Sequence, residues 1–362
     1  MATKRLTARC HCGNTHFTLT LPTSSLPLKT HLCHCKICRT VHGALAAFHA
    51  HLPDGVVPEF VSPSGLDKTT GYKHSQAKAY RHFCSTCGCH IGDRAENANR
   101  WCISVSVFDA NANQGAWEIA EHVYTTPTKD GGLAALLPTI AGKEVKVWNP
   151  EPGNETGIID DALAISSGGT GDDRDTLLAK CHCGGVSFNI SRPRKEFVES
   201  PDGEKWVMRS HPTKWLASLD ACSDCRLVTG THVIGWLFVP TDHISPPPAE
   251  DLLIGTSKVY NSSEDVSRTF CGQCGATVFY SESGRPGIVD VAIGIIRHGD
   301  GVMLNGCAIW RTARLGWAEN GFKYDEGFTR SLAEGLQDWG RRTHGKVRDF
   351  AVGTASVNAE IQ

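Results

Sequence analysis

Alternating hydrophobic and polar residues predict several short β-strands along this chain. Residues 17–21 alternate in this way, and residues 44–51 have the same strand-like character. Residues 101–108 place Ile103, Val105 and Val107 on one side. The apolar stretch 288–296 also has the length of a strand. Together these patterns predict a mainly β protein.

One segment near the end of the chain has a different period. Phe328, Leu332, Leu336 and Trp339 repeat at helical spacing, which predicts a short C-terminal helix within residues 326–350. We expect this helix to pack on the second half of the chain, and we assign it no chemistry. The tail after Asp349 is expected to be loosely held.

Three cysteine motifs occur twice in the same order. Cys10-His-Cys12-Gly returns as Cys181-His-Cys183-Gly, and the later motifs return at an offset of 187 residues. These later motifs are Cys33-His-Cys35-Lys-Ile-Cys38-Arg39, matched by Asp220-Ala-Cys222-Ser-Asp-Cys225-Arg226, and Arg81-His-Phe83-Cys84-Ser-Thr-Cys87-Gly, matched by Arg268-Thr-Phe270-Cys271-Gly-Gln-Cys274-Gly. Conserved order and spacing of this kind indicate an internal duplication.

The repeat defines the predicted domains. We expect a first zinc domain at 1–150, a linker rich in Pro, Gly and Ser at 151–177, a second zinc domain at 178–325, and a helix and tail at 326–362. The second copy carries 16 additional residues within 192–215, just before its middle motif. This insertion is either a lid over that site or a surface loop.

Composition and charge narrow the possible partners. The chain has 362 residues, 40% of them hydrophobic. Its net charge of −2 does not indicate the positive charge typical of proteins that bind nucleic acid. The N-terminal residues contain no apolar segment typical of a secretion signal, and no run reaches the ~20 apolar residues of a membrane span. We therefore expect a cytoplasmic protein that binds a small-molecule substrate, with no nucleic-acid or membrane partner.

The spacing of the 16 cysteines favours metal binding over disulfides. Only Cys89, Cys102 and Cys307 lie outside the Cys-x-Cys and Cys-x-x-Cys clusters. In each copy, the first and last motifs supply four thiols. These would occupy all four coordination positions of a tetrahedral zinc ion, so we expect two structural zinc sites. Their predicted ligands are Cys10, Cys12, Cys84 and Cys87 in the first copy and Cys181, Cys183, Cys271 and Cys274 in the second. Redox-active thiols or a chance spacing of the cysteines are the alternative interpretations.

The middle motif has only three cysteines, Cys33, Cys35 and Cys38. Three protein ligands leave zinc an open position, which predicts a catalytic site. The second copy has Asp220 in place of the first of these cysteines, followed by Cys222 and Cys225. Because a carboxylate is a harder ligand than a thiolate, zinc there would be a stronger Lewis acid and would bind more weakly. Either this site serves a different reaction or it has decayed, so we expect two to four zinc ions per chain.

Other residues near the motifs are weaker candidates. Arg39 and Arg226 follow the middle clusters and are predicted to contact a substrate carboxylate or to compensate the thiolate charge. Arg81 and Arg268 are expected to have a structural or compensating role. The segments His122-Val-Tyr124 and Ala308-Ile-Trp310 occupy matching places by sequence offset, as pocket walls or as core aromatics.

The ordered set of three motifs resembles the glutathione-dependent formaldehyde-activating enzyme family, which also includes centromere protein V. The resemblance covers residues 5–150 and 178–325. It implies two tandem β-tent domains, each with a structural zinc, and catalytic zinc on Cys33, Cys35 and Cys38. Asp220 departs from the family pattern. The implied activity is addition of glutathione to formaldehyde, which gives S-hydroxymethylglutathione.

Three hypotheses about function follow. The first is a zinc-dependent lyase of the carbon–sulfur type that acts on a thiol and an electrophilic carbon such as an aldehyde. The second is an enzyme of the same fold that acts on a larger metabolite by hydrolysis, dehydration or rearrangement at Asp220, Cys222 and Cys225. The third is a non-catalytic zinc module that binds a protein partner.

Overall fold

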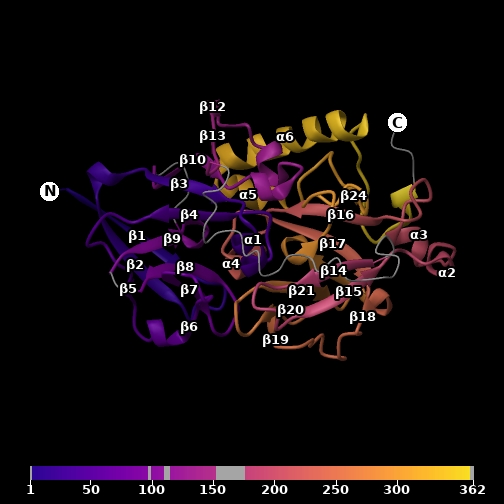
Figure 1. The fold of residues 1–362 in the computed structure, drawn as a ribbon, viewed down its shortest axis with the longest axis horizontal. Helices are drawn as coiled ribbons and strands as arrows, with labels where there is room; N and C mark the ends of the chain where they lie inside the picture. Colours follow the sequence, from indigo (N-terminus) through magenta and orange to yellow (C-terminus); the bar gives the residue numbers. More distant parts are fainter. Residues whose placement is uncertain (1, 97–98, 110–114, 152–175, 359–362) are drawn as a thin grey trace.

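The computed structural model describes residues 2–96, 99–109, 115–151 and 176–358. The protein is mainly β, as the alternating pattern predicted, and each copy of the repeat builds one small and one large sheet. Nearly all of the predicted linker at 151–177 lies outside the described residues. The two copies lie side by side, and the C-terminal helix runs above them (Figure 1).

The first copy contains a three-stranded and an eight-stranded sheet, together with a two-stranded ribbon of β11 (Thr139–Ile140) and β12 (Lys143–Glu144). The small sheet has the order β1 (Thr3–Arg9), β2 (His16–Pro22) and β5 (Glu59–Phe60). The large sheet has the order β13 (Lys146–Trp148), β10 (Trp117–Val123), β3 (Leu28–Cys33), β4 (Ala47–His51), β9 (Trp101–Ser104), β8 (His90–Ala95), β7 (Ala79–Cys84) and β6 (Thr69–Tyr72). Helix α1 (Lys36–His42) follows β3 directly.

The second copy repeats this arrangement with a four-stranded and a seven-stranded sheet. The small sheet has the order β18 (Ile244–Ser245), β15 (Ser187–Ser191), β14 (Thr176–Lys180) and β23 (Ile296–Arg297). The large sheet has the order β19 (Ser257–Ser263), β20 (Val266–Cys271), β21 (Thr277–Glu282), β22 (Ile288–Ala292), β17 (Ile234–Pro240), β16 (Trp215–Asp220) and β24 (Ala308–Trp310). Helix α4 (Ser223–Thr229) is the counterpart of α1.

Two of the expected strands are shorter than their apolar patterns. The strand expected at 101–108 ends at Ser104, whose side chain accepts a hydrogen bond from the amide of Ser106 at 3.3 Å and starts a 3-10 turn. The apolar run 288–296 also breaks after Ala292 into a 3-10 turn at Ile293–Ile295. An apolar run does not by itself distinguish a strand from another buried conformation.

The two copies contact each other through reciprocal interactions. The amide of His11 donates to the carbonyl of Leu227 at 3.1 Å, and the equivalent amide of His182 donates to the carbonyl of Thr40 at 3.2 Å. Phe83 and Phe270, which occupy equivalent positions, pack against each other with ring centroids 6.3 Å apart. The duplicated halves therefore pack like the subunits of a two-fold symmetric dimer.

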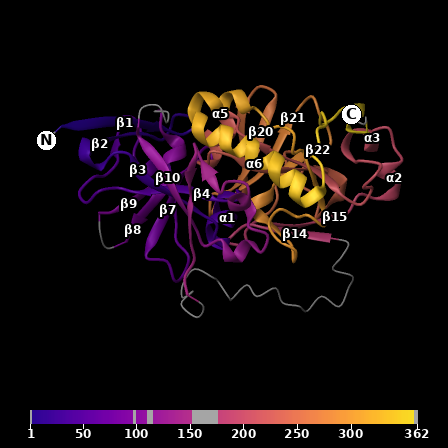
Figure 2. The same cartoon turned by 90° about the horizontal axis from the view of Figure 1, so that it is seen from above.

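The C-terminal helix forms as predicted, and it packs on both copies. Helix α6 (Glu326–His344) buries Phe328, Leu332, Leu336 and Trp339, and it follows α5 (Ala318–Tyr324). Phe328 packs on Phe48 of the first copy at 5.4 Å, whereas Trp339 packs on Trp310 of the second copy at 6.3 Å. The helix therefore packs on the second copy, as expected, and on the first copy as well. Figure 2 shows it lying across the junction of the two halves.

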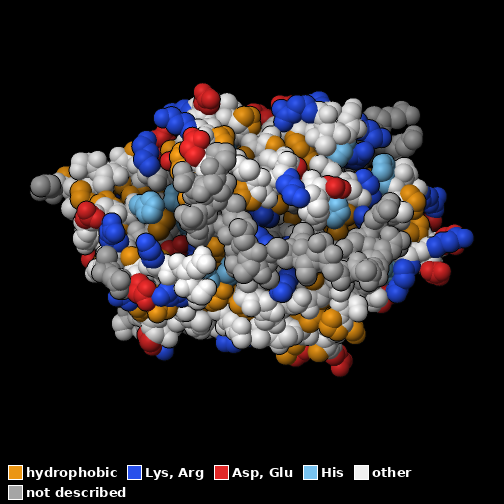
Figure 3. Space-filling view, viewed as in Figure 1, with side chains coloured by type: hydrophobic (Ala, Val, Ile, Leu, Met, Phe, Trp, Pro, Cys, Tyr) orange, Lys and Arg blue, Asp and Glu red, His pale blue; other side chains and the backbone are white. Residues whose placement is uncertain are grey.

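The surface carries both signs of charge. Lysine and arginine side chains are interspersed with aspartate and glutamate on the face seen in Figure 3, in keeping with the small net charge. Among the described residues, no helix is both long enough and apolar enough to cross a membrane.

Candidate metal centres

Each copy gathers its first and last cysteine motifs into one group of four thiols. Within each group the four sulfur atoms lie within 4.8 Å of one another. Cys12 Sγ lies 3.4 Å from Cys10 Sγ and 3.5 Å from Cys84 Sγ, and the second group has the same close spacing. Four converging soft donors fit a tetrahedral zinc ion. The chemistry and the geometry of the donor sets therefore agree.

Glycines shape the turns around these groups. Gly88 has a φ of +80°, and a Cβ built there would lie 2.6 Å from the ring of Phe270 in the other copy. Gly275 has the same φ and the same relation to Phe83. Only glycine suits both the left-handed backbone and the close approach. The four-thiol groups and the interface between the copies thus share these turns.

The three cysteines of the first middle motif also come together. Strand β3 ends at Cys33, and Cys35 is the N-cap of α1, where its sulfur accepts a hydrogen bond from the amide of Cys38 at 3.3 Å. All three sulfur atoms lie within 4.8 Å of one another, and the side chains are at most 6% exposed. Contacts from the Cys33 and Cys38 thiols lower the pKa of Cys35 well below its usual value, although burial opposes this shift. Such a group has the donors for one zinc ion with an open position.

Asp220, Cys222 and Cys225 form the equivalent group in the second copy, with their donor atoms also within 4.8 Å of one another. Asp220 Oδ1 accepts a hydrogen bond from the amide of Cys222 at 2.6 Å. Burial raises the pKa of Asp220 to about 7, in spite of this hydrogen bond. Both middle clusters are thus assembled by the fold.

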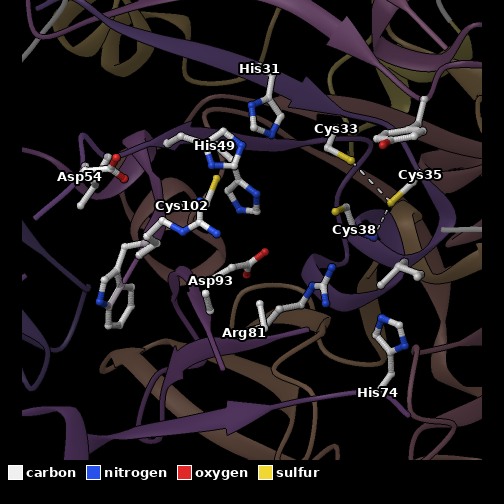
Figure 4. A pocket seen from close by; sticks show the side chains of 18 residues that line it. His31, Cys33, Cys35, Cys38, His49, Asp54, His74, Arg81, Asp93 and Cys102 are labelled. Carbon is white, nitrogen blue, oxygen red and sulfur yellow. Dashed lines mark hydrogen bonds between the residues drawn. The ribbon is translucent and has the colours of Figure 1, made fainter. Parts of the chain in front are cut away.

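The surroundings of the two middle clusters differ. A cavity of about 590 Å³ opens beside Cys33, Cys35 and Cys38. Its other walls include polar and apolar side chains, among them His31, His49, His51, Arg81, Asp93, Cys102, Trp101 and Tyr124. Figure 4 shows the three sulfurs at one side of this cavity, with Arg81 beside them and Asp93 farther away, toward Cys102. A cavity of this size can hold a small organic substrate.

Aromatic side chains occupy the corresponding region of the second copy. By strand register, Trp236, Phe238 and Tyr280 stand where the first copy has His49, His51 and Asp93. Trp236 and Phe238 belong to the same buried cluster as Cys225. The guanidinium of Arg285 lies 5.6 Å from the Tyr280 ring centroid and 5.9 Å from that of Phe238.

The insertion and the tail complete this aromatic packing. The insertion forms two short helices, α2 (Lys195–Val198) and α3 (Gly203–Trp206), and its Trp206 packs on Phe238 at 6.0 Å. Phe350 and Val357 are 1% and 2% exposed in the same cluster, so the expectation of a loose tail after Asp349 was wrong for residues 350–358. Residues 359–362 lie outside the described residues. The insertion therefore contributes Trp206 to the buried cluster that also contains Cys225.

The four arginines near the middle clusters have two kinds of surroundings in the structure. Arg39 and Arg226 bond to backbone carbonyls, whereas Arg81 and Arg268 face the clusters. Arg39 Nε donates to the carbonyl of His34 at 3.0 Å, and Arg226 donates to the carbonyl of Ser106 and stacks on Tyr324. Neither Arg39 nor Arg226 lines the cavity.

Arg81 and Arg268 are the arginines that face the clusters. Arg268 Nη1 lies 3.4 Å from Cys225 Sγ, and Arg81 lines the cavity. Burial lowers the pKa of Arg81, but Asp93, Cys38 and Cys35 outweigh it and raise this pKa overall. The expected compensating role of this pair is consistent with these contacts.

The sheet register corrects the match between Tyr124 and Trp310, which was based on sequence offset alone. Val123 pairs with Cys33, and Gly316 bridges Asp220, so Tyr124 corresponds to Trp317 and not to Trp310. Tyr124 and Trp317 also share a left-handed backbone, with φ of 58° and 51°. Trp310 is a fully buried core residue, whereas Tyr124 lines the cavity. The offset between the copies changes here because the connections before these residues differ in length.

Sequence reasoning missed several cavity residues. His31, His49, His51, Asp93 and Cys102 belong to no cysteine motif, yet they line the wall of the cavity beside the first cluster. The His-x-His spacing of residues 49 and 51 on a predicted strand was the available signal, because alternate residues face the same side.

Comparison with known families agrees with this geometry. The model of the family described as glutathione-dependent formaldehyde-activating enzyme matches residues 5–127 and 206–311, more than half of the chain. The chain belongs to this family. The first matched segment contains all seven cysteines of its two clusters, whereas the second begins after Cys181 and Cys183. The first copy therefore follows the family pattern more completely.

Comparisons with individual proteins do not identify a relative of known function. Among solved structures, the chain is similar to a Rhodobacter sphaeroides protein solved by crystallography, with 17% identity, a TM-score of 0.24, and coverage of 37% of this chain and 98% of that one. None of the curated proteins compared with the chain matches it. Membership of the formaldehyde-activating family thus rests on the family model.

Proposed function

We propose that this protein is a zinc-dependent enzyme of the carbon–sulfur lyase type, which joins a thiol such as glutathione to an aldehyde or another electrophilic carbon. The observation that carries this proposal is the convergence of Cys33, Cys35 and Cys38 on the wall of a 590 Å³ cavity. Family membership supports a thiol and a carbonyl as the reactants. The free thiols of the chain also support the cytoplasm as its compartment.

The reaction needs no oxidant or reductant. The thiol sulfur forms a bond to the carbonyl carbon, the carbon–oxygen π pair moves to oxygen, and the thiol proton ends on that oxygen. Cys33, Cys35 and Cys38 would hold the catalytic zinc. When bound, zinc supplies Lewis acidity and makes a thiol easier to deprotonate near neutral pH. The two four-thiol groups would hold structural zinc ions.

The protein's own side chains orient the reactants. Arg81 carries a permanent positive charge beside the cluster, and the charge of its strand partner Asp93 raises the pKa of this guanidinium. This charge favours the developing negative oxygen. The phenol of Tyr124, at the wall of the same cavity, can donate a proton to that oxygen. Apolar side chains such as Ile37 and Trp101 limit the water around the reacting atoms.

The proposal places turnover in the first copy. In the second copy, Trp236, Phe238 and Trp206 fill the region next to Cys225. This packing argues against a larger substrate that reacts at Asp220. We assign the second cluster a structural role, with or without a metal ion.

The test is an assay in which the protein is mixed with glutathione and each of a panel of aldehydes. The quantities measured are the loss of free thiol and the formation of the adduct. Cys35→Ser should reduce kcat/KM at least 100-fold, whereas Cys222→Ser and the control Cys307→Ser should stay within about threefold of wild type. No turnover by the zinc-loaded wild type with any aldehyde would overturn the proposal. A loss confined to Cys222→Ser would move the reaction to the second copy.

A further inference from the structure

A second group of metal-ligand side chains lines the cavity of the first copy. His31, His51 and Cys102 each offer one donor atom, and these three atoms lie within 4.8 Å of one another. In Figure 4, His31 and Cys102 lie on the side of the cavity away from Cys35 and Cys38. The group is therefore separate from the three-cysteine cluster but shares its cavity.

Strand pairing brings these residues together. They come from three neighbouring strands, β3, β4 and β9, and His51 is the direct partner of Cys102 in the antiparallel register. The rings of His31 and His51 are stacked with centroids 5.5 Å apart. Because the sheet fixes all three backbones, the three side chains project from set positions before any ligand binds.

The second copy provides an internal comparison. At the same positions of its sheet it has Ser218, Phe238 and Asp290. None of the three preserves the donor of the first copy, and Asp290 is instead paired with Arg285 at 2.9 Å. The His, His and Cys set thus occurs only in the copy that retains three cysteines and an open cavity.

A neighbouring imidazole supports a ligand-binding role for this wall. His49 is 3% exposed and lines the same cavity, and its Nε2 has no hydrogen-bond partner among the described residues. A buried nitrogen without a partner is costly in a folded protein. A bound ion with its own water or substrate ligand would supply the missing partner.

We propose that His31, His51 and Cys102 form an additional binding site for a divalent transition metal, with zinc the preferred ion. Two imidazoles and one thiolate are donors that zinc favours, and three protein ligands leave one coordination position open. The cavity would then hold two metal ions, one on three sulfurs and one on this mixed set. This site does not depend on the proposed thiol–aldehyde reaction.

Zinc X-ray absorption spectroscopy tests the site directly. The other four metal groups of the described residues contain only sulfur donors and one carboxylate, so among these groups only the additional site would give imidazole scattering. Full-length protein is loaded with zinc, passed through a desalting column, and measured for zinc per chain and for imidazole scattering. We expect wild type to show imidazole scattering and to hold one zinc more than His51→Gln/Cys102→Ser.

The matched control changes another cysteine and histidine that lie close together. Cys307 Sγ lies 3.1 Å from His298 Nε2, outside any metal-ligand group of the described residues. His298→Gln/Cys307→Ser should keep both the zinc count and the imidazole signal. His51→Gln alone, a change at an exposed side chain, should lose the extra zinc even if the double variant folds poorly.

Equal zinc counts in wild type and His51→Gln, or a spectrum with sulfur and oxygen scattering only, would overturn the proposal. Loss of the imidazole signal in the His298→Gln/Cys307→Ser control would also overturn it. An inactive protein that still shows imidazole-bound zinc would refute the proposed reaction and support the additional site. The two proposals are therefore tested separately.

Discussion

The phenol oxygen of Tyr72 lies 2.6 Å from Nδ1 of His182, which belongs to the Cys-His-Cys motif of the other copy. The reverse pair has the same length, 2.6 Å between Tyr260 Oη and His11 Nδ1. Each histidine sits between two predicted zinc ligands and contacts a tyrosine of the opposite half. The zinc loops are thus part of the contact that holds the duplicated halves together.

Removal of either phenol hydroxyl should weaken this contact. Tyr72→Phe and Tyr260→Phe should each lower the free energy of unfolding by about 1 kcal/mol, because each leaves a histidine nitrogen without its partner. Urea denaturation followed by tryptophan fluorescence measures this change. Tyr80→Phe, at a side chain that is 38% exposed, is the control and should have no effect. Equal stability of all four proteins would show that the pairs contribute nothing.

Loss of structural zinc should unfold the protein locally or globally. Cys12→Ser removes one donor of a closed four-thiol group, and we expect zinc content to fall and the Tm to drop by at least 10 °C. A strong chelator should have the same effect on wild type. Scanning calorimetry with zinc analysis measures both quantities. Cys307→Ser should retain wild-type values, and an unchanged Tm in Cys12→Ser would refute a structural metal there.

The packing beside the second cluster should stabilise the fold without serving turnover. Trp206 is 4% exposed, and Trp206→Ala should cost about 3–5 kcal/mol in the free energy of unfolding. Because this side chain belongs to the buried cluster of Cys225 and does not line the first-copy cavity, kcat/KM with thiol and aldehyde should change less than threefold below the melting range. Leu178→Ala, at a side chain that is 40% exposed in the small sheet of the second copy, is the control. A large loss of activity with normal stability would show that the second cluster takes part in turnover.

Substitution of Arg81 should lower activity, whereas substitution of Arg39 should lower stability. Arg81→Gln removes the charge beside Cys38 and should lower kcat by about 10- to 100-fold, with partial recovery in Arg81→Lys. Arg39→Gln removes a buried hydrogen bond to the carbonyl of His34 and should reduce stability with little change in KM. Steady-state kinetics and thermal denaturation separate these outcomes. A rise in KM for Arg39→Gln at unchanged stability would instead support substrate contact by Arg39.

A buried histidine at the interface should make stability depend on pH. Burial lowers the pKa of His90 to about 4, from an ordinary value near 6.5. Between these values the unfolded chain binds a proton that the folded protein does not, so stability is full above pH 6.5 and falls as the pH drops toward 4. This group should contribute about 3 kcal/mol to that fall.

His90→Gln removes the titrating group and should flatten the dependence. Urea unfolding at several pH values between 4 and 7, compared with wild type and with the half-buried control His16→Gln, measures the difference. Parallel curves for His90→Gln and wild type would show that His90 does not titrate in this range.

The amino-acid sequence by itself determined the repeat, the mainly β class, the C-terminal helix and the membership of cysteines in clusters. Most of these features are local or periodic, and the grouping of the first and last cysteine motifs rested on their repetition in both copies. Thiols such as Cys35 and Cys38 are close because few bonds separate them, and alternation along a strand follows from backbone geometry alone.

Only the tertiary structure decided which cluster faces a cavity and which is surrounded by aromatic side chains. His51 and Cys102 meet because two strands pair, and Trp206 and Phe350 reach the second cluster from distant segments. Helix α6 spans both copies for a similar reason, since its apolar face could be buried on either half. These contacts join segments that are distant in the sequence, so they depend on how the surfaces of the folded elements pack. The spacing of residues along the chain does not predict that packing.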